Sequence, residues 1–293
     1  MKHKQAGRRI KDCASDRALY GVVNALLALM MLLVAYPLLN ILSSSFSSPR
    51  AVSTGRVVLL PVEFSLLGYQ TVFAHRLIGI AYRNTIFYSL AGTLINLTMV
   101  LTCAYPLSRR DFPLRSPLMI ACLITMYFSG GLIPSYILMV QLGLINNVWA
   151  MLLPGALSVY NMILTRTYIL SNVPVELLEA SQIDGCSDAR YFTAVLLPLC
   201  KPIIAVVALY SVVGHWNSYF NALIYLNDQR LFPLQLILRQ ILISSEINPS
   251  DMGDIEGAIA KQGLSDLLKY ALIVVATAPI LCVYPFLQRF FVK

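Results

Sequence analysis

The polar residues that could do chemistry in this chain gather in one short stretch past its midpoint. Residues 176–188 hold four of the 14 acidic side chains, namely Glu176, Glu179, Asp184 and Asp188. Ala180 and Ser181 follow Glu179 directly, and Gly185 lies a few residues further on. Small side chains let another backbone approach closely, and a glycine permits a sharp turn. Glu179 can also pair with a cation or cap a helix of a partner. The plain alternative is an ordinary amphipathic helix at the inner surface.

The motifs of catalysis and nucleotide binding are missing from the sequence. No Gly-x-x-x-x-Gly-Lys-Ser/Thr loop occurs, so this chain cannot hydrolyse ATP by itself. None of the 6 cysteines has the spacing of a zinc site. Of Asp, Glu and His, only His215 lies within the apolar runs, and a lone histidine there is more often a packing residue than a proton relay. A membrane enzyme would need a clustered pair such as His with Asp, which we do not find.

The composition is that of a membrane protein. Hydrophobic residues make up 58% of the 293 residues and charged residues only 12%, against about 25% charged in soluble proteins. This balance excludes an ordinary cytosolic enzyme and a disordered protein. The net charge of +8 is not a sign of nucleic-acid binding, since that needs basic residues clustered on a wet face.

Six apolar segments without Asp, Glu, Lys or Arg are long enough for helices that cross a bilayer. The first exceeds the apolar region of a signal peptide, so we interpret it as a retained span. Continuous apolarity favours helices over a β-barrel, whose strands alternate in polarity. The sequence therefore predicts an all-α membrane protein with six transmembrane helices, at Leu19–Ile41, Asn84–Ala104, Pro117–Val140, Val148–Thr165, Pro202–Asn227 and Tyr270–Leu287.

The distribution of Lys and Arg predicts that both termini are cytoplasmic. With the N-terminus inside, the short inner segments hold most of the 22 basic residues, as the positive-inside rule requires. The expected organisation is a cytoplasmic segment at 1–18, a first span at 19–41, an external loop at 42–83, a five-helix core at 84–287 and a cytoplasmic tail at 288–293. Residues 143–147 form a tight external hairpin. The long outer segments, 42–83 and 228–269, are either a docking surface or plain connectors.

The inner segment Arg166–Lys201 is expected to fold on the cytoplasmic face as helix, glycine turn and helix. Pro174 suits the first position of a helix, because its missing N–H costs nothing there. Gly185 can take the left-handed conformation that ends a helix. A second short helix near Asp188–Leu197 would then run to Pro198 and the fifth span.

Candidate residues of a solute pathway are polar but uncharged, which favours a neutral, hydroxyl-rich solute. Asn217 and Asn221 are four residues apart and would share a helix face, with aromatic residues such as Trp216 and Tyr219 beside them. Gly130, Gly131 and Pro134 would loosen the third span, and broken helices often line transporter cavities. The alternative is that the aromatic residues anchor helices at the interface and that the asparagines join neighbouring helices.

The inner segment resembles the cytoplasmic signature of importer-type ABC permeases. That signature is Glu-Ala-Ala, three residues, Gly, nine residues and then Ile-x-Leu-Pro. This chain has the same spacing, with Ser181 and Val195 as conservative departures. Four further segments look like those of the maltose-transporter-type carbohydrate permeases, in the branch for complex polysaccharides: 130–136, 153–156, 216–220 and 285–293.

The resemblance implies a type I importer permease in the cytoplasmic membrane, with no cofactor of its own. It implies a second related permease, two cytoplasmic ATPase subunits that use ATP, an extracytoplasmic solute-binding protein, contact with membrane lipid and no nucleic acid. The coupling loop, 171–200, would dock into the ATPase through Glu179, Ala180, Ser181, Gly185, Leu197 and Pro198. The rival interpretations are a proton- or ion-coupled secondary carrier and an importer of another solute class, such as peptides or metals.

Overall fold

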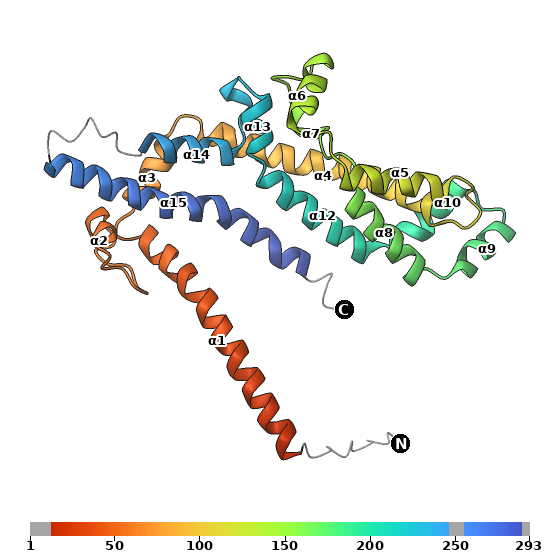
Figure 1. Cartoon of the computed structure of the whole chain (residues 1–293), viewed down its shortest axis with the longest axis horizontal. Helices are drawn as coiled ribbons and strands as arrows, with labels where there is room; N and C mark the ends of the chain where they lie inside the picture. Colours follow the sequence, from red (N-terminus) through yellow and green to blue (C-terminus); the bar gives the residue numbers. More distant parts are fainter. Residues whose placement is uncertain (1–12, 246–254, 289–293) are drawn as a thin grey trace. The chain divides into compact units, whose positions relative to one another are not determined.

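A computed structural model describes residues 13–245 and 255–288, and this part of the chain is helical, with no β-strand. The tails at 1–12 and 289–293, and residues 246–254 of the outer segment, lie outside the described residues. Figure 1 shows the order of the helices. They are α1 Ala14–Ser45, α2 Pro49–Ser53, α3 Leu67–Ala74, α4 Ile78–Ser108, α5 Arg115–Tyr127, α6 Leu132–Gln141, α7 Trp149–Leu152, α8 Val159–Asn172, α9 Val175–Ile183, α10 Asp188–Tyr191, the π-helical turn η1 Phe192–Leu196, α11 Leu197–Leu199, α12 Lys201–Trp216, α13 Phe220–Tyr225, the 3₁₀ turn η2 Gln229–Leu231, α14 Leu234–Ser245 and α15 Ile255–Gln288.

The chain divides into two compact units, Met1–Gly68 with Ile247–Val274, and Tyr69–Glu246 with Val275–Lys293. In the first unit, α1 is apolar all round and none of its apolar stretch is buried, so its surface is free for lipid or another chain. At the end of α1, Asn40 Nδ2 donates to the carbonyls of Val57 and Val58, each at 3.0 Å. The hydroxyl of Ser43 donates to the Leu59 carbonyl at 2.6 Å. These bonds fold the following segment back onto the helix.

Three helices of the described residues are long and apolar enough to cross a membrane, and the number rises to five if each of two bent pairs is one span. The single helices contain the predicted first, second and sixth spans. The predicted third span is one of the bent pairs, since α5 and α6 meet at 111° across residues 128–131. Gly131 has φ +85°, a backbone conformation that glycine adopts without the Cβ clash that other residues meet.

The prediction of a single helix over Val148–Thr165 is wrong. The short helix α7 ends at Leu152, and α8 begins only at Val159 and continues to Asn172, past Arg166. Pro154 and Gly155 lie in the gap, and Gly155 has φ +94°. A proline and a left-handed glycine cannot continue a regular helix, and hydropathy alone does not detect such a break.

The prediction of one helix over Pro202–Asn227 is also wrong. Helix α12 ends at Trp216, Asn217 caps it, and a separate short helix, α13, begins at Phe220. The backbone amides of Asn217 and Ser218 bond to the carbonyls of Val213 and His215 and close the last turn. Asn217 and Asn221 therefore do not share a helix face.

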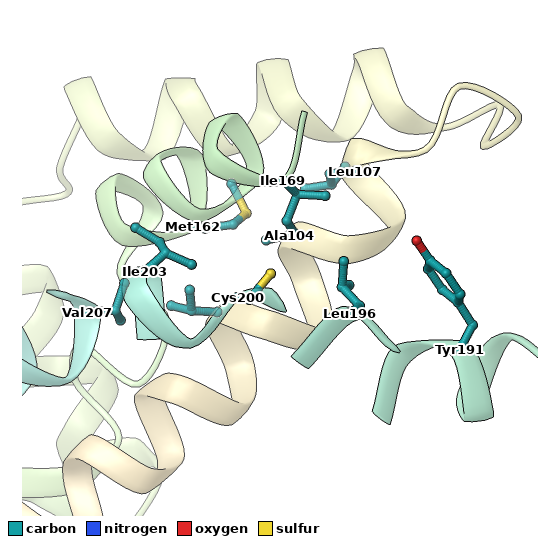
Figure 2. Packing of buried hydrophobic residues seen from close by; sticks show 10 residues of the cluster. Ala104, Leu107, Met162, Ile169, Tyr191, Leu196, Cys200, Ile203 and Val207 are labelled. Atoms are coloured by element: carbon teal, nitrogen blue, oxygen red, sulfur yellow. The ribbon is translucent and has the colours of Figure 1, made fainter. Parts of the chain in front are cut away.

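The core of the second unit joins α4, α8 and α12 to the segment around α10. Figure 2 shows these side chains pointing toward one another. On α4, Val100, Ala104 and Leu107 recur at the spacing of one helix face. Cys200, between α11 and α12, is fully buried among them. The remaining buried members are Met162, Ile169, Tyr191, Leu196, Ile203 and Val207. The inner segment is thus packed directly on the long helices.

Candidate functional site

The inner segment folds as helix, glycine turn and helix, as its sequence predicts. Pro174 is the N-cap of α9, one position earlier than expected. After α9 the amide of Gly185 bonds to the Gln182 carbonyl at 3.1 Å, and that of Cys186 to the Ser181 carbonyl at 2.9 Å. This pair of bonds is the Schellman motif, which needs a left-handed residue after the helix. Gly185 provides it with φ +70°.

Helix α9 lies largely at the surface, with Leu178 packed partly against the core. None of its residues is buried, and Glu179, Ala180 and Gly185 are exposed. Ile183, just before the glycine turn, is 86% exposed. This large aliphatic side chain is therefore open to contact with another molecule. Sequence reasoning missed Ile183, although its place between Glu179 and Gly185 was a usable signal.

The chain continues from the turn into the core. The hydroxyl of Ser187 accepts from the Arg190 amide at 3.4 Å as the N-cap of α10. The π-helical turn η1 follows, and such turns are frequent at functional sites. Leu197 and Pro198 lie in α11, and the axis then bends by 80° into α12. The predicted signature thus begins at Glu179, on the exposed helix α9, and ends at Pro198, in α11 just before α12.

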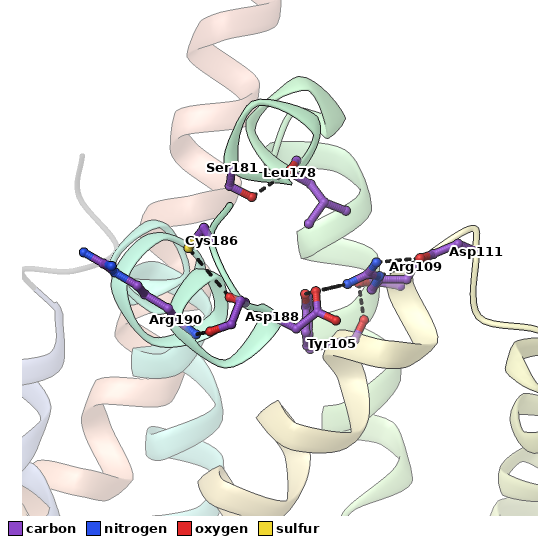
Figure 3. Close-up of polar contacts among 10 residues, drawn as sticks. Tyr105, Arg109, Asp111, Leu178, Ser181, Cys186, Asp188 and Arg190 are labelled. Atoms are coloured by element: carbon purple, nitrogen blue, oxygen red, sulfur yellow. Dashed lines mark hydrogen bonds and ion pairs between the residues drawn. The ribbon is translucent and has the colours of Figure 1, made fainter. Parts of the chain in front are cut away.

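Arg109, the first residue after α4, connects the inner segment to that helix (Figure 3). Its guanidinium forms ion pairs with Asp111 and with Asp188 of α10. It also donates to the Tyr105 hydroxyl at 3.1 Å. The hydrogen bonds that Arg109 donates to Asp111 are the main cause that raises the pKa of Arg109 above its usual value, and they lower the pKa of the Asp111 carboxyl. Arg109 and Asp111 are therefore both charged at neutral pH.

A cleft of about 560 Å³ opens beside this cluster. It is lined by the ends of α4 and α8 and by one side of α9, including Arg109, Glu176, Glu179 and Gln182. Both signs of charge face the cleft, which suits the polar surface of another protein. The Nε of Arg166 donates to the Leu107 carbonyl at 2.8 Å, so the ends of α4 and α8 that form its walls are also bonded to each other.

A second, polar pocket of about 430 Å³ lies among the long helices of the same unit. Of the described residues that line it, none is Asp, Glu, Lys or Arg. The side-chain amide of Asn96 on α4 donates to the carbonyls of Gly155 and Ala156, at 3.2 and 3.1 Å. These carbonyls belong to the break between α7 and α8, and Asn96 replaces the helix bonds that the break removes. The polar lining residues are Asn96, Ser158, Tyr160, Asn161, Tyr210, Ser211, His215, Ser218 and Asn221.

The polar face of α4 continues beyond Asn96. Ser89, Thr93 and Asn96 follow one another at helical spacing, and each has a buried side-chain oxygen that lacks a hydrogen-bond partner among the described residues. Between them, Gly92 lies against His215: a Cβ at Gly92 would come within 2.3 Å of the His215 Nε2. The absence of a side chain at Gly92 is thus what gives the His215 ring its place in the pocket wall.

The predicted pathway residues lie in different parts of the structure. Asn221 lines the pocket. Trp216 is buried, and its indole donates to the Ala276 carbonyl at 2.9 Å, so its role is in helix packing. The guanidinium of Arg239 lies over the Tyr219 ring at 4.9 Å, and Gln235 donates to the Asn217 side chain at 3.5 Å. Gly130, Gly131 and Pro134 lie exposed at the bend between α5 and α6.

Most of the pocket residues escaped sequence reasoning. Asn96, Tyr160 and Tyr210 lie inside apolar runs, where a single polar residue carries no signal of its own. The helix break at Pro154 and Gly155 does carry a signal, because the carbonyls that it frees must find hydrogen-bond partners. The sequence predicts His215 chiefly as a packing residue.

The glycine turn after α9, the exposed surface of α9 and the long apolar helices are features of a chain that also matches a known protein family. Residues 11–293 match the family described as binding-protein-dependent transport system inner membrane component. The chain belongs to this family. The resemblance inferred from the sequence signature is thereby confirmed.

Three relatives illustrate the similarity to other family members. The polygalacturonan/rhamnogalacturonan transport system permease protein YtcP of Bacillus subtilis is 36% identical over 97% of both chains. Protein LplC of the same organism is 38% identical over 88% of this chain and 86% of its own. The diacetylchitobiose uptake system permease protein NgcG of Streptomyces coelicolor is 27% identical over 94% and 87%.

A solved structure extends the similarity to the fold. It is described as the crystal structure of a bacterial ABC transporter involved in the import of the acidic polysaccharide alginate. One of its chains is 33% identical, with a TM-score of 0.84, over 96% of this chain and 99% of that one. YtcP and NgcG are permease proteins of transport or uptake systems, and none of these relatives supports the proton-coupled carrier.

Proposed function

We propose that this chain is the transmembrane permease subunit of an ABC importer and carries a carbohydrate, most simply an oligosaccharide, into the cell by alternating access. The observation that carries the proposal is the form of α9: a helix with no buried residue, closed by a Schellman glycine and followed by a segment packed on the long helices. An element that is exposed on one side and anchored on the other suits the transfer of motion from a partner.

The partner would be a cytoplasmic ATPase, because the chain has no phosphate-binding loop. Two such subunits, a second related permease and an extracytoplasmic solute-binding protein complete the proposed importer, which lies in the cytoplasmic membrane with both termini inside. ATP-driven closure of the ATPase pair moves α9 and favours one orientation of the spans over the other. A partner can shift this equilibrium only by binding the two orientations with different affinity.

The polar pocket is the proposed passage for the solute. Its hydroxyl, amide and imidazole groups can exchange hydrogen bonds with sugar hydroxyls, and Tyr160 and Tyr210 offer flat faces to sugar rings. Polar groups are costly within a membrane unless they meet other polar groups or water. The unpartnered oxygens on α4 support a passage that a hydrated or hydroxylated solute occupies in part of the cycle.

The proposal is tested with the assembled transporter in sealed vesicles. Uptake of labelled oligosaccharides is measured with the solute-binding protein outside and ATP inside, over a panel of neutral and acidic saccharides. We expect uptake of at least one saccharide that requires ATP and is unaffected by a protonophore. Uptake driven by a proton gradient without the ATPase subunits would contradict the proposal.

A further inference from the structure

Arg109 is bonded to two carboxylates that lie in different parts of the unit. Asp111 is two residues away, on the connection that follows α4, and its carboxylate accepts from the Arg109 Nε at 2.9 Å. Asp188 is 79 residues away, in the first turn of α10. Of these two carboxylates, only Asp188 belongs to the inner segment, so its ion pair with Arg109 joins that segment to the end of α4 (Figure 3).

The surroundings hold the guanidinium of Arg109 in one place. Its side chain is only 12% exposed, and its Cζ lies 5.8 Å from the centre of the Tyr105 ring. Tyr105 in turn packs against Tyr191 and Phe192, with ring centres 6.1 and 5.4 Å apart. A planar guanidinium that is stacked and bonded to two carboxylates has little freedom to swing. The contact between α10 and α4 is thus both ionic and aromatic.

The cluster also bridges a weak point of α4. Pro106 lies in the last turn of the helix, where its missing N–H removes a backbone hydrogen bond to the turn before. The bond from Arg109 to the Tyr105 hydroxyl joins residues on either side of this proline. The same helix carries Gly92 and Asn96 of the polar pocket.

We propose that the Arg109–Asp188 ion pair is the link through which movement of the coupling loop reaches α4 and the pocket. Arg109 and Asp188 are positioning residues: neither touches the solute, and the docking surface for the ATPase is α9, on the other side of the Gly185 turn. The inference rests on the proposed function, since it assigns a route for work that the ATPase supplies. Breaking the link leaves assembly and ATP hydrolysis intact and uncouples them from transport.

The test compares two isosteric changes in the assembled transporter. Asp188→Asn removes the charge on the side of the coupling loop, and Asp111→Asn is the matched control, because it removes the other carboxylate of the same arginine. Three quantities are measured in sealed vesicles: the amount of ATPase subunit retained, the rate of ATP hydrolysis and the saccharide imported per ATP. Since Asp188 is 66% exposed, neutralising it should not prevent folding.

We expect the Asp188→Asn transporter to retain the ATPase subunits. The amount of saccharide imported per ATP should fall about fivefold, because an ion pair with one partner exposed to solvent contributes a modest coupling energy. Asp111→Asn should stay within about twofold of wild type. In a double-mutant cycle, Arg109→Gln with Asp188→Asn should be no worse than Arg109→Gln alone.

Three results would overturn the link. These are equal effects of the two aspartate changes, additive effects in the cycle, or loss of the ATPase subunits from Asp188→Asn, which would make Asp188 part of the docking surface. Failure of the wild-type transporter to import any saccharide with ATP would instead refute the proposed function, so the two failures are distinguishable.

Discussion

Gly185 permits a controlled test of docking, because the chain contains a second glycine in the same local structure. Gly143 ends α6 as Gly185 ends α9. The amides of Gly143 and Leu144 bond to the carbonyls of Val140 and Met139 in the same Schellman pattern. The two φ angles are +67° and +70°, and a Cβ at either glycine meets nothing within 4 Å. The substitution Gly→Trp should therefore strain both turns equally.

The magnitude of that strain follows from the backbone. A residue other than glycine in the left-handed region costs about 1–2 kcal/mol, and the open space around both positions adds no steric clash. Since a folded domain is stable by about 5–15 kcal/mol, both variants should fold and insert. Asparagine tolerates the left-handed conformation, so Gly185→Asn separates the effect of a side chain from that of strain.

The assay measures permease in the membrane, ATPase subunit retained on purification, and saccharide uptake. We expect Gly185→Trp and Gly143→Trp to reach the same membrane level, and only Gly185→Trp to lose the ATPase subunit and uptake. Gly185→Asn should fall between Gly185→Trp and wild type. Normal uptake by Gly185→Trp, or an equal loss in Gly143→Trp, would refute the assignment of this turn to docking.

Three further predictions concern other parts of the chain. Ile183→Ala should weaken retention of the ATPase subunit about tenfold, because an aliphatic side chain gains roughly 1.5 kcal/mol or more on burial; unchanged retention in a pull-down would remove Ile183 from the interface. Gly92→Ala should displace His215 and reduce saccharide uptake without reducing assembly, whereas Gly79→Ala on the same helix, with nothing within 4 Å of its Cβ, should not; equal uptake by both variants would argue against a role for the pocket. The hydrogen bond from Ser48, with help from Arg56, lowers the pKa of Glu63. The ionised Glu63 carboxylate therefore stabilises the outer segment fully above the usual carboxyl pKa, and this stabilisation is lost as pH falls through the lowered pKa. Glu63→Gln should therefore make that segment more sensitive to protease at neutral pH, as acid does in wild type, and a wild-type cleavage rate in this variant would count against the bond.

The fold class and the glycine turn after α9 could be predicted because their signals are local. A run of apolar residues determines that a segment prefers lipid, whatever its neighbours are. A glycine after an amphipathic stretch determines a left-handed cap, and Gly185 has that conformation. The orientation of the termini and the partner subunits stay predictions, since they depend on chains and a membrane that lie outside this fold.

The positions of the helix breaks could not be predicted in the same way. The interruption at Pro154 and Gly155 frees carbonyls inside an apolar region, and it is tolerated because Asn96, from another helix, donates to them. The end of α12 at Trp216 likewise involves a distant group, the carbonyl of Ala276. Hydropathy assigns each residue a preference for lipid but says nothing of such partners.

The sequence by itself determined that this protein is a helical membrane permease whose inner segment folds as helix, glycine turn and helix, because composition, spacing and the turn glycine act over a few residues. Only the tertiary structure decided which polar side chains face one pocket and that Arg109 pairs with Asp188. These contacts join residues far apart in the chain, and their partners are selected by how α4 packs on α8, α10 and α12.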